Sequence, residues 1–356
     1  MRKKLFAVAL TVALLVMLAL SACGGDIATS ESPPESSETA TNPAELDTPI
    51  ESETTVDVEP GAPSRDIVAL AAEIEFDPDN YTDIILDVPY MDDGEDYHLL
   101  DLYGTQSYDG VKPTVIEIHG GGFIGGTRGN NSGHSIFYAE RGYKVVVPDY
   151  GKVPRHGDFK DAIQDLFSAF HWVEENADAY GFDLNNIFLS GDSAGGYYTL
   201  LCCAIFHSGE LQEYFGVTLP DFKFATYVTT CPAADYRDLR SHLQDESGPK
   251  AHMAQSVGEE LLMDDDLMDH MDLMMNVEPE AFAGIYMMTT PTDTMTGEEV
   301  QTFDAYLTEQ GIEHTTLSYD GVENDIIHTF NISHADYAES KVANQDMVDY
   351  LDAHLK

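Results

Sequence analysis

The chain has 356 residues, with 64 acidic against 17 basic side chains and a formal net charge of −47 at pH 7. This acidity excludes binding to the phosphate backbone of nucleic acids and disfavours adsorption of the folded protein to anionic lipids. The four cysteines show no metal-ligand spacing, so we expect no bound metal.

Residues 1–22 have the pattern of a bacterial lipoprotein signal peptide. Arg2-Lys3-Lys4 makes a positive start, residues 5–20 are apolar, and Leu20-Ser21-Ala22-Cys23 resembles a lipobox. In such a signal the cysteine carries more than one acyl chain, which stable anchoring requires. We therefore expect Cys23 to be lipidated and the protein to lie outside the cytoplasm, attached to the bacterial cell membrane through its lipid only. An ordinary secretory peptide and a short membrane span are the alternatives.

Residues 23–72 are predicted to be a disordered tether. Residues 24–64 are rich in Ser, Thr, Glu and Pro and nearly lack aromatic side chains. Such a segment cannot bury enough apolar surface to offset the entropy lost on ordering. From residue 73 onward, residues 73–356 fit one large domain.

Strand-like and helix-like segments alternate through this domain. Strands are predicted at 83–86, 97–102, 114–118, 144–148, 225–230, 284–290 and 314–319, and helices at 135–141, 161–180 and 198–206. This alternation predicts an α/β fold with a mostly parallel central sheet flanked by helices.

A glycine-rich loop follows the strand predicted at 114–118. It reads His119-Gly120-Gly121-Gly122-Phe123. Bare backbone can approach a substrate closely, and in acyl-transfer enzymes such a loop supplies N–H groups to a developing oxyanion. We predict that the N–H groups of Gly121 and Gly122 belong to an oxyanion hole, which His119 and Gly120 support structurally.

A second glycine-rich turn lies between a strand and a helix. The apolar run from Ile187 ends in Gly191-Asp192-Ser193-Ala194-Gly195-Gly196, the layout of a nucleophile elbow. Gly191 and Gly195 leave room beside a serine held on a strained turn. Ser193 is therefore the predicted nucleophile, the Ala194 N–H the third oxyanion donor, and Asp192 a structural support. A glycine-rich turn that binds phosphate or has no role is the alternative.

HGGGF followed about seventy residues later by GDSAGG resembles the hormone-sensitive-lipase-like esterases of the α/β-hydrolase fold. The resemblance runs from about residue 97 to the C-terminus. Family members usually carry a Tyr-Arg-Leu-Ala-Pro-Glu-like segment after the next strand, whereas this chain has Asp149-Tyr150-Gly151-Lys152-Val153-Pro154-Arg155.

Residues 241–283 interrupt the alternation of strands and helices with a helical pattern. The segment holds methionines among aspartates, at Met253, Met263, Met268, Met271, Met274 and Met275. One interpretation is a helical cap whose methionine-lined underside forms the acyl pocket, since thioethers fill irregular apolar spaces. The other is an amphipathic segment that packs its methionines on the core.

The remaining catalytic partners are predicted after the last two strands. In this fold an acid follows one late strand and a histidine follows the next, in the chain order Ser, Asp, His. Asp293 and His328 satisfy that order, and His328-Thr329-Phe330 resembles the family's His-Gly-Phe. The rival acids are Asp320, Asp325 and Glu298, and the rival histidine is His334.

These residues predict a serine carboxylester hydrolase that cleaves short-chain acyl or aryl esters, including acetylated carbohydrate, through an acyl-enzyme. Its partner is a small-molecule ester, and the chemistry needs no cofactor. A same-fold amidase or peptidase and a non-catalytic surface binding protein are the alternatives. The sequence does not indicate an oligomeric state. Cys231 could form a disulfide with Cys202 or Cys203 in an exported protein.

Overall fold

The computed structural model describes residues 65–106 and 110–356. The predicted signal peptide, Cys23 and the predicted tether as far as residue 64 lie outside the described residues. Within the described ranges, no helix is both long enough and apolar enough to cross a bilayer.

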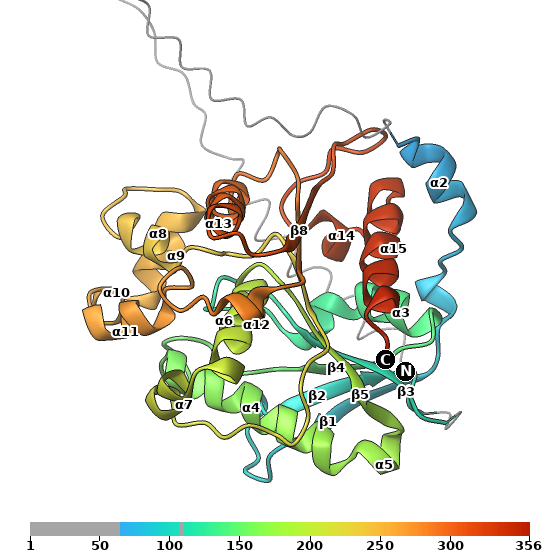
Figure 1. Cartoon of the computed structure of the whole chain (residues 1–356), viewed down its shortest axis with the longest axis horizontal. Helices are drawn as coiled ribbons and strands as arrows, with labels where there is room; N and C mark the ends of the chain where they lie inside the picture. The colour runs from blue at the N-terminus through green and yellow to red at the C-terminus, as the bar shows by residue number, and fades with distance from the viewer. Residues whose placement is uncertain (1–64, 107–109) are drawn as a thin grey trace, which may run out of the picture. The chain divides into compact units, whose positions relative to one another are not determined.

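The described residues form an eight-stranded sheet in the order β1-β2-β4-β3-β5-β6-β7-β8 (Figure 1). The pairs β1·β2 and β2·β4 are antiparallel, and every other neighbouring pair is parallel. The predicted α/β class and mostly parallel sheet are therefore confirmed. The strands are β1 (Ile84–Pro89), β2 (Leu99–Tyr103), β3 (Lys112–Ile118), β4 (Lys144–Pro148), β5 (Phe182–Asp192), β6 (Tyr227–Thr230), β7 (Ile285–Thr289) and β8 (His314–Ser318).

Helices cover both faces of the sheet, because successive side chains of each buried strand point to opposite faces. Ile116 of β3 packs in one core cluster and Val115 in the other. The first cluster is shared with α4 (Phe159–Glu175), α6 (Ala194–His207) and α13 (Gly297–Glu309), and the second with α3 (Ser132–Glu140) and α15 (Ala338–Ala353). The shorter helices on the domain are α5 (Ala177–Tyr180), α7 (Gly209–Phe215) and α14 (Phe330–Ser333).

The compact part of the chain begins before the boundary predicted at residue 73. Helix α2 (Ile67–Glu73) packs against α15, and Ala71 is buried between them. The predicted tether, residues 23–72, therefore extends too far, because residues 67–72 belong to the compact unit. Residues 67–72 are all apolar, in contrast to the polar segment before them, so the composition already changes at residue 67 and the boundary was set too late.

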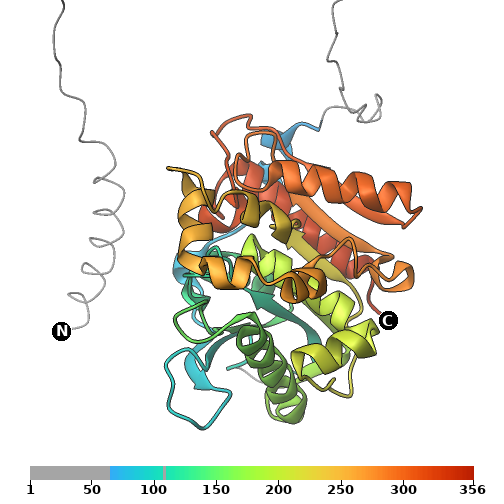
Figure 2. The same ribbon diagram turned by 90° about the vertical axis from the view of Figure 1, so that its left-hand side faces the viewer.

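The predicted insertion at 241–283 consists of short helices that follow α8 (Tyr236–Ser241). They are α9 (Pro249–Val257), α10 (Glu259–Leu262), α11 (Asp265–Met271) and α12 (Pro279–Phe282). Helices α8 to α11 contact one another and lie together at one side of the domain in Figure 1, which Figure 2 turns toward the viewer. The helical character predicted for this segment is confirmed.

Candidate active site

Ser193 lies on the turn between β5 and α6 in a strained conformation. Its backbone has φ +52° and ψ −118°, which a residue with a side chain rarely adopts. A side chain at Gly191 would collide with the Gly195 carbonyl, and one at Gly195 would collide with the Ile118 carbonyl of β3. The two glycines therefore allow the turn to pack against the neighbouring strand while Ser193 faces the pocket, as the elbow pattern predicts.

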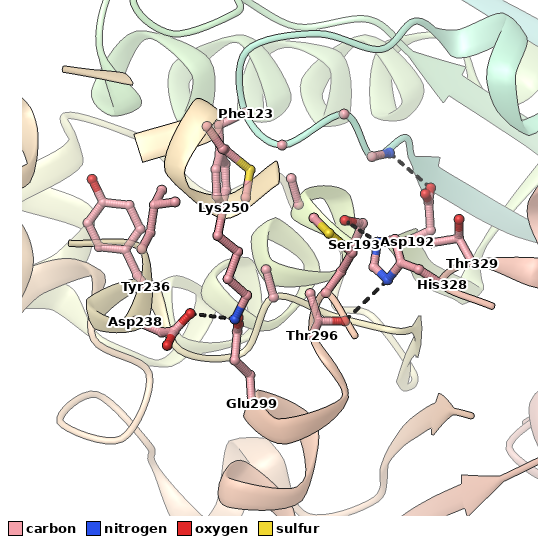
Figure 3. Close-up of a pocket in the computed structure, with 18 of the residues that line it drawn as sticks. Phe123, Asp192, Ser193, Tyr236, Asp238, Lys250, Thr296, Glu299, His328 and Thr329 are labelled. Carbon is pink, nitrogen blue, oxygen red and sulfur yellow. Dashed lines mark hydrogen bonds and ion pairs between the residues drawn. The ribbon is translucent and has the colours of Figure 1, made fainter. Parts of the chain in front are cut away.

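The structure brings Ser193, His328 and Asp293 into one hydrogen-bonded chain (Figure 3). His328 Nε2 lies 2.9 Å from Ser193 Oγ, and His328 Nδ1 lies 2.9 Å from Asp293 Oδ2. Asp293 follows β7 and His328 follows β8, and the carboxyl ends of β5, β6, β7 and β8 lie at one edge of the sheet. The parallel order thus joins side chains that are 135 and 35 residues apart in sequence.

Asp293 is held in its ionised form. Its Oδ1 accepts hydrogen bonds from the N–H groups of Met295 (2.8 Å) and Thr296 (3.1 Å), and Thr296 Oγ1 lies 2.9 Å from Oδ2. Burial alone would raise the pKa of Asp293, but the hydrogen bond and charge attraction of His328 and these N–H groups outweigh it and lower the pKa below its usual value. A charged acceptor therefore faces His328 Nδ1.

The rival candidates do not join this chain of hydrogen bonds. Asp320, Asp325 and Glu298 are exposed side chains. His334 is exposed and stacks on Tyr337, with ring centroids 4.4 Å apart.

The glycine loop borders the same pocket as Ser193. Gly120, Gly121, Gly122 and Ala194 all line it. Gly121 has φ +135° and Gly122 has φ +61°, so the loop uses backbone conformations open to glycine. The Gly121 carbonyl accepts a hydrogen bond from the Gly125 N–H at 3.0 Å, which closes the loop on itself.

Asp192 fastens the glycine loop to the elbow. Its buried Oδ1 accepts hydrogen bonds from the Gly120 N–H (2.9 Å) and from Asn131 Nδ2 (2.8 Å). Burial raises the pKa of Asp192, and the bond from Asn131 opposes this. Asn131 in turn donates to Glu117 of β3, which also contacts His134 at 2.6 Å. The support predicted for Asp192 is present, whereas the buried Glu117 network had no sequence signal.

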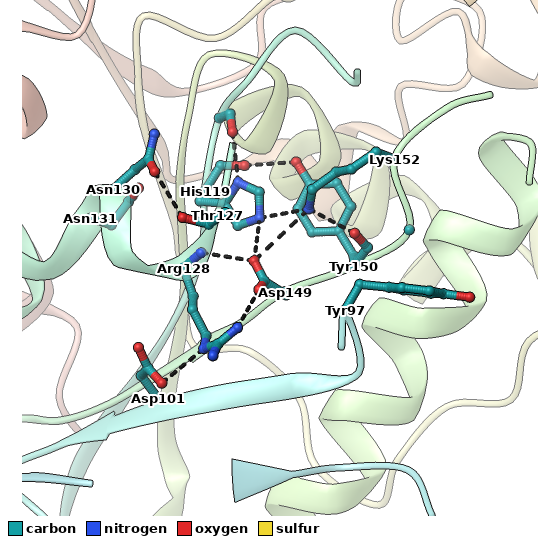
Figure 4. Close-up of polar contacts among 12 residues, drawn as sticks. Tyr97, Asp101, His119, Thr127, Arg128, Asn130, Asn131, Asp149, Tyr150 and Lys152 are labelled. Carbon is teal, nitrogen blue, oxygen red and sulfur yellow. Dashed lines mark hydrogen bonds and ion pairs between the residues drawn. The ribbon is translucent and has the colours of Figure 1, made fainter. Parts of the chain in front are cut away.

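His119 is the centre of a second buried network (Figure 4). Its Nδ1 donates to the Gly120 carbonyl at 2.6 Å, and its carbonyl accepts from the Tyr150 hydroxyl at 2.7 Å. Lys152 Nζ lies 2.9 Å from His119 Nε2, and Asp149 Oδ1 lies 3.1 Å from the same nitrogen. Arg128 also pairs with Asp149. Burial lowers the pKa of His119, and the hydrogen bond with Asp149 opposes this without reversing it.

Lys152 is a residue whose role the sequence did not reveal. It stands in the segment that departs from the family's usual Tyr-Arg-Leu-Ala-Pro-Glu pattern, and that departure is the signal that could have identified it. Burial lowers the pKa of Lys152 to about 8. The segment of residues 149–155 therefore supports the glycine loop, because its Lys152 contacts His119.

The pocket beside Ser193 has a volume of about 410 Å³. Its apolar lining includes Phe123, Tyr236, Leu239, Met253 and Ile332. Phe123 follows the glycine loop and makes edge contacts with the rings of Phe159, Tyr197, Tyr198 and Tyr236, which hold that end of the loop against α4, α6 and α8.

One methionine of the 241–283 insertion lines the pocket and others pack in the core, so each of the two interpretations of this segment holds in part. Met253 lines the pocket. Met268 and Met271 are fully buried in the core, and Met263 and Met275 are about half exposed, at 49% and 61%. The pocket lining thus draws on one methionine of the insertion, while core packing accounts for two others.

The three cysteines within the described residues, Cys202, Cys203 and Cys231, are buried free thiols, so the structure holds no bridge from Cys231. Cys231 Sγ, Asp293 and His328 have donor atoms within 4.8 Å of one another, close enough to share a metal ion. His328 and Asp293 are already bonded to each other, and Cys231 Sγ accepts from the Thr329 N–H at 3.5 Å. We assign this group to the Ser193 arrangement.

Among solved structures, the chain is similar to the crystal structure of esterase B from Lactobacillus rhamnosis HN001. The TM-score is 0.70 at 28% sequence identity, and the match covers 81% of this chain and 90% of that chain.

Among curated proteins, the chain is similar to isoprenylcysteine alpha-carbonyl methylesterase ICME of Arabidopsis thaliana, with 36% identity over 133 residues (33% of this chain, 30% of that protein). It is 32% identical to hormone-sensitive lipase of Mus musculus over 117 residues, which are 33% of this chain and 14% of that protein. The chain thus spans about a third or less of the length of these curated relatives. The relationship to hormone-sensitive lipase that the motifs indicated is present.

A match to a protein-family model identifies the family of this chain. The BD-FAE model matches residues 100–299, more than half of the chain, from β2 into α13. The matched region includes the glycine loop, Ser193 and Asp293. Together with the eight-stranded α/β sheet, this match shows that the chain belongs to the BD-FAE family of α/β-hydrolases.

Proposed function

We propose that this protein is a serine carboxylester hydrolase that cleaves short-chain acyl or aryl esters, including acetylated carbohydrate. The observation that carries the proposal is the position of His328, which bridges Ser193 Oγ and Asp293 Oδ2 at 2.9 Å on each side. Such an arrangement activates a hydroxyl group for acyl transfer. The similarity to esterase B supports the ester as the bond attacked.

In the first half of the reaction, Ser193 Oγ attacks the ester carbonyl and His328 Nε2 accepts its proton. Asp293 accepts a hydrogen bond from His328 Nδ1, which fixes the tautomer and stabilises the imidazolium ion. His328 then gives the proton to the leaving alcohol, and the acyl group remains on Ser193.

The negative oxygen of the tetrahedral intermediate needs donors on the opposite side from His328. We assign this role to the N–H groups of Gly121, Gly122 and Ala194, which all line the pocket. Loss of one such donor typically raises the barrier by about 2.7–4 kcal/mol. Asp192 and His119 maintain the loop through their bonds to the Gly120 N–H and carbonyl.

In the second half, water replaces the alcohol and His328 acts as the base again. The acid is released when Ser193 recovers its proton. The scheme uses only side chains and backbone groups of this chain together with water.

The pocket volume of about 410 Å³ suits a small substrate. A second crystal structure of esterase B, 27% identical to this chain, shows that enzyme inhibited by a C4-C4 tributyrin phosphonate. Short acyl chains are therefore the class to test first, as a series of p-nitrophenyl esters from acetate to octanoate.

The decisive experiment compares wild type with Ser193→Ala on p-nitrophenyl acetate and on the matching anilide. We expect the wild type to cleave the ester in preference to the amide, and Ser193→Ala to lose at least about 10³-fold in kcat. Ser333→Ala, the same change at another position of the pocket, is the control and should retain turnover. Ester turnover that persists in Ser193→Ala would reject this nucleophile, and preferred cleavage of the anilide would favour an amidase.

We also propose that acylation of Cys23 anchors the protein at the outer face of a bacterial cell membrane. The support is the sequence pattern of residues 1–23. The expected result is that wild type, expressed in a bacterial host, enters the detergent phase in a two-phase extraction, whereas Cys23→Ala stays in the aqueous phase or in the untranslocated pool. Equal partition of the two proteins would contradict the anchor.

A further inference from the structure

Three of the charged side chains that line the pocket form a cluster away from Ser193. Lys250 comes from α9, Asp238 from α8 and Glu299 from α13. Lys250 Nζ donates to Glu299 Oε1 at 2.7 Å and also to Asp238 Oδ2. In Figure 3 the Lys250 side chain ends between the two carboxylates, set apart from Ser193. The reaction proposed above uses none of the three.

These groups are largely removed from solvent. The side chains of Lys250 and Glu299 are 18% and 8% exposed, and that of Asp238 is 29% exposed. Desolvating charged groups is costly, and apolar side chains of similar size would often hold two helices together as well or better. Holding α8, α9 and α13 together therefore does not by itself explain why charged side chains occupy this pocket.

The cluster has hydrogen-bonding capacity left over. An ammonium group has three N–H donors, and within the described part of the chain Lys250 bonds to the two carboxylates. Glu299 Oε2 accepts from the Asp235 N–H at 3.3 Å, a long contact. His242 Nε2 also lies 3.4 Å from Asp238 Oδ2, the oxygen that Lys250 bonds. One N–H of Lys250, the Oδ1 atom of Asp238 and lone pairs on Glu299 thus remain for a ligand.

The charge of the pocket selects the kind of ligand. Asp192, Asp235, Asp238 and Glu299 line it against one lysine. An anionic substrate would meet more negative than positive groups at short range. Burial raises the pKa of Glu299 to about 7, which reduces but does not remove this excess. A neutral hydroxyl group fits, because it can accept from the ammonium and donate to a carboxylate at once.

We propose that Lys250 is a specificity-determining residue, which with Glu299 and Asp238 forms a polar subsite that hydrogen-bonds a neutral hydroxyl group of the ester substrate. The subsite rests on the proposed ester hydrolysis and extends it, because it selects hydroxylated esters over plain esters of equal size. The hydroxyl can belong to the alcohol part or to the acyl part.

The test measures a ratio of kcat/KM values on matched neutral esters. Glycerol 1-acetate against 2-methylbutyl acetate places the hydroxyls on the alcohol part, and methyl 3-hydroxybutyrate against methyl 3-methylbutanoate places one on the acyl part, so that a methyl group of similar size replaces each hydroxyl. We expect wild type to favour the hydroxylated member of at least one pair by about tenfold or more. In Lys250→Met this ratio should fall by about tenfold, chiefly through KM, because the hydroxyl loses its donor.

Two further variants separate recognition from packing. Lys223→Met makes the same change at an exposed site outside the pocket and should keep the wild-type ratio. Glu299→Gln removes one charge but keeps hydrogen-bonding atoms, and should shift the ratio less than Lys250→Met does. Thermal unfolding of each variant shows whether it is folded.

Three results would overturn the proposal. A wild type without preference in either pair would do so, as would a Lys250→Met variant that lowers both members of a pair equally, since that is the effect of a loosened cap. If Lys250→Met does not fold, an unchanged ratio in Glu299→Gln overturns it. Failure of the proposed function would look different, because the wild type would then hydrolyse no ester at all.

Discussion

The contact between Asp293 and His328 determines which nitrogen of the His328 ring carries the proton. His328 Nδ1 faces Asp293 Oδ2, so the ring presents an unprotonated Nε2 to Ser193. Because Asp293 is buried and accepts from two backbone N–H groups, it can stay ionised through the proton transfers that we propose for His328.

Asp293→Asn tests that dependence. An asparagine amide would donate to His328 Nδ1 and leave the proton on Nε2, which disables the base without emptying the site. We expect kcat on p-nitrophenyl acetate to fall about 10³- to 10⁴-fold. Asp325→Asn, at an exposed carboxylate in the loop of His328, is the control and should match wild type. Similar losses in both variants would argue that loop disturbance, and not the tautomer, is responsible.

At the scale of elements, α15 holds the loop that carries His328. Glu339, in the first turn of α15, accepts hydrogen bonds at Oε1 from the N–H groups of Val322 (2.8 Å), Glu323 (2.6 Å) and Asn324 (3.0 Å). Its Oε2 accepts from Asn324 Nδ2 at 2.8 Å. A carboxylate with no direct contact to Ser193 thus shapes the segment between β8 and His328.

Glu339→Gln should destabilise the protein at neutral pH by roughly 2 kcal/mol, since a neutral amide weakens bonds to a charged acceptor. Burial would raise the pKa of Glu339, but the bonds from Asn324 and Glu323 lower it from 4.5 to about 2. The folded pKa lies below the unfolded one, so this stabilisation is present above pH 4.5 and is lost as the pH falls toward 2.

Thermal unfolding at a series of pH values checks this prediction. The difference in Tm between wild type and Glu339→Gln should be largest near pH 7 and shrink below pH 4.5. Glu309→Gln, an exposed change on α13, should show no such dependence. A constant difference at every pH would contradict the assignment.

Side-chain hydrogen bonds to the backbone set the ends of α4, and the apolar pattern of the sequence did not reveal them. The helix predicted at 161–180 begins at Phe159, because Asp158 caps it by accepting from the N–H groups of Lys160 and Asp161. It ends at residue 175, where the Asn176 side chain donates to the Trp172 carbonyl and the helix does not continue in register.

For the whole molecule, the position of α2 predicts how far the N-terminus can be shortened. Ile67 and Ile74 pack beside Ala71 on α15, and Arg65 Nη2 donates to Asp346 Oδ1 at 2.8 Å. A variant lacking residues 2–64 should keep the Tm and kcat/KM of the compact unit. A variant lacking residues 2–74 should lose roughly 1–3 kcal/mol of stability, because it exposes the apolar surface that α2 covers.

Comparing the Tm values of the two truncated variants separates the contribution of α2 to stability from that of residues 2–64. Equal Tm values for the two would show that α2 adds no stability. A lower Tm already in the shorter truncation would show that residues 2–64 stabilise the domain.

The sequence by itself determined the parts that short strings encode. The glycines of residues 119–123 and 191–196, the alternation of strands and helices, and the chain order Ser, Asp, His are local patterns, and each corresponds to a feature of the structure. The selection of Asp293 over three rival acids followed from one topological rule, because the carboxyl ends of parallel strands share one edge.

Only the tertiary structure decided which side chains support and line the site. Lys152 meets His119, Glu339 meets residues 322–324, and Lys250 meets Glu299 through contacts between separate elements. Lysine and glutamate are usually solvated surface residues, so their type gives no sign of such contacts. Their burial and pairing depend on how the helices pack on the sheet, which no spacing within the chain encodes.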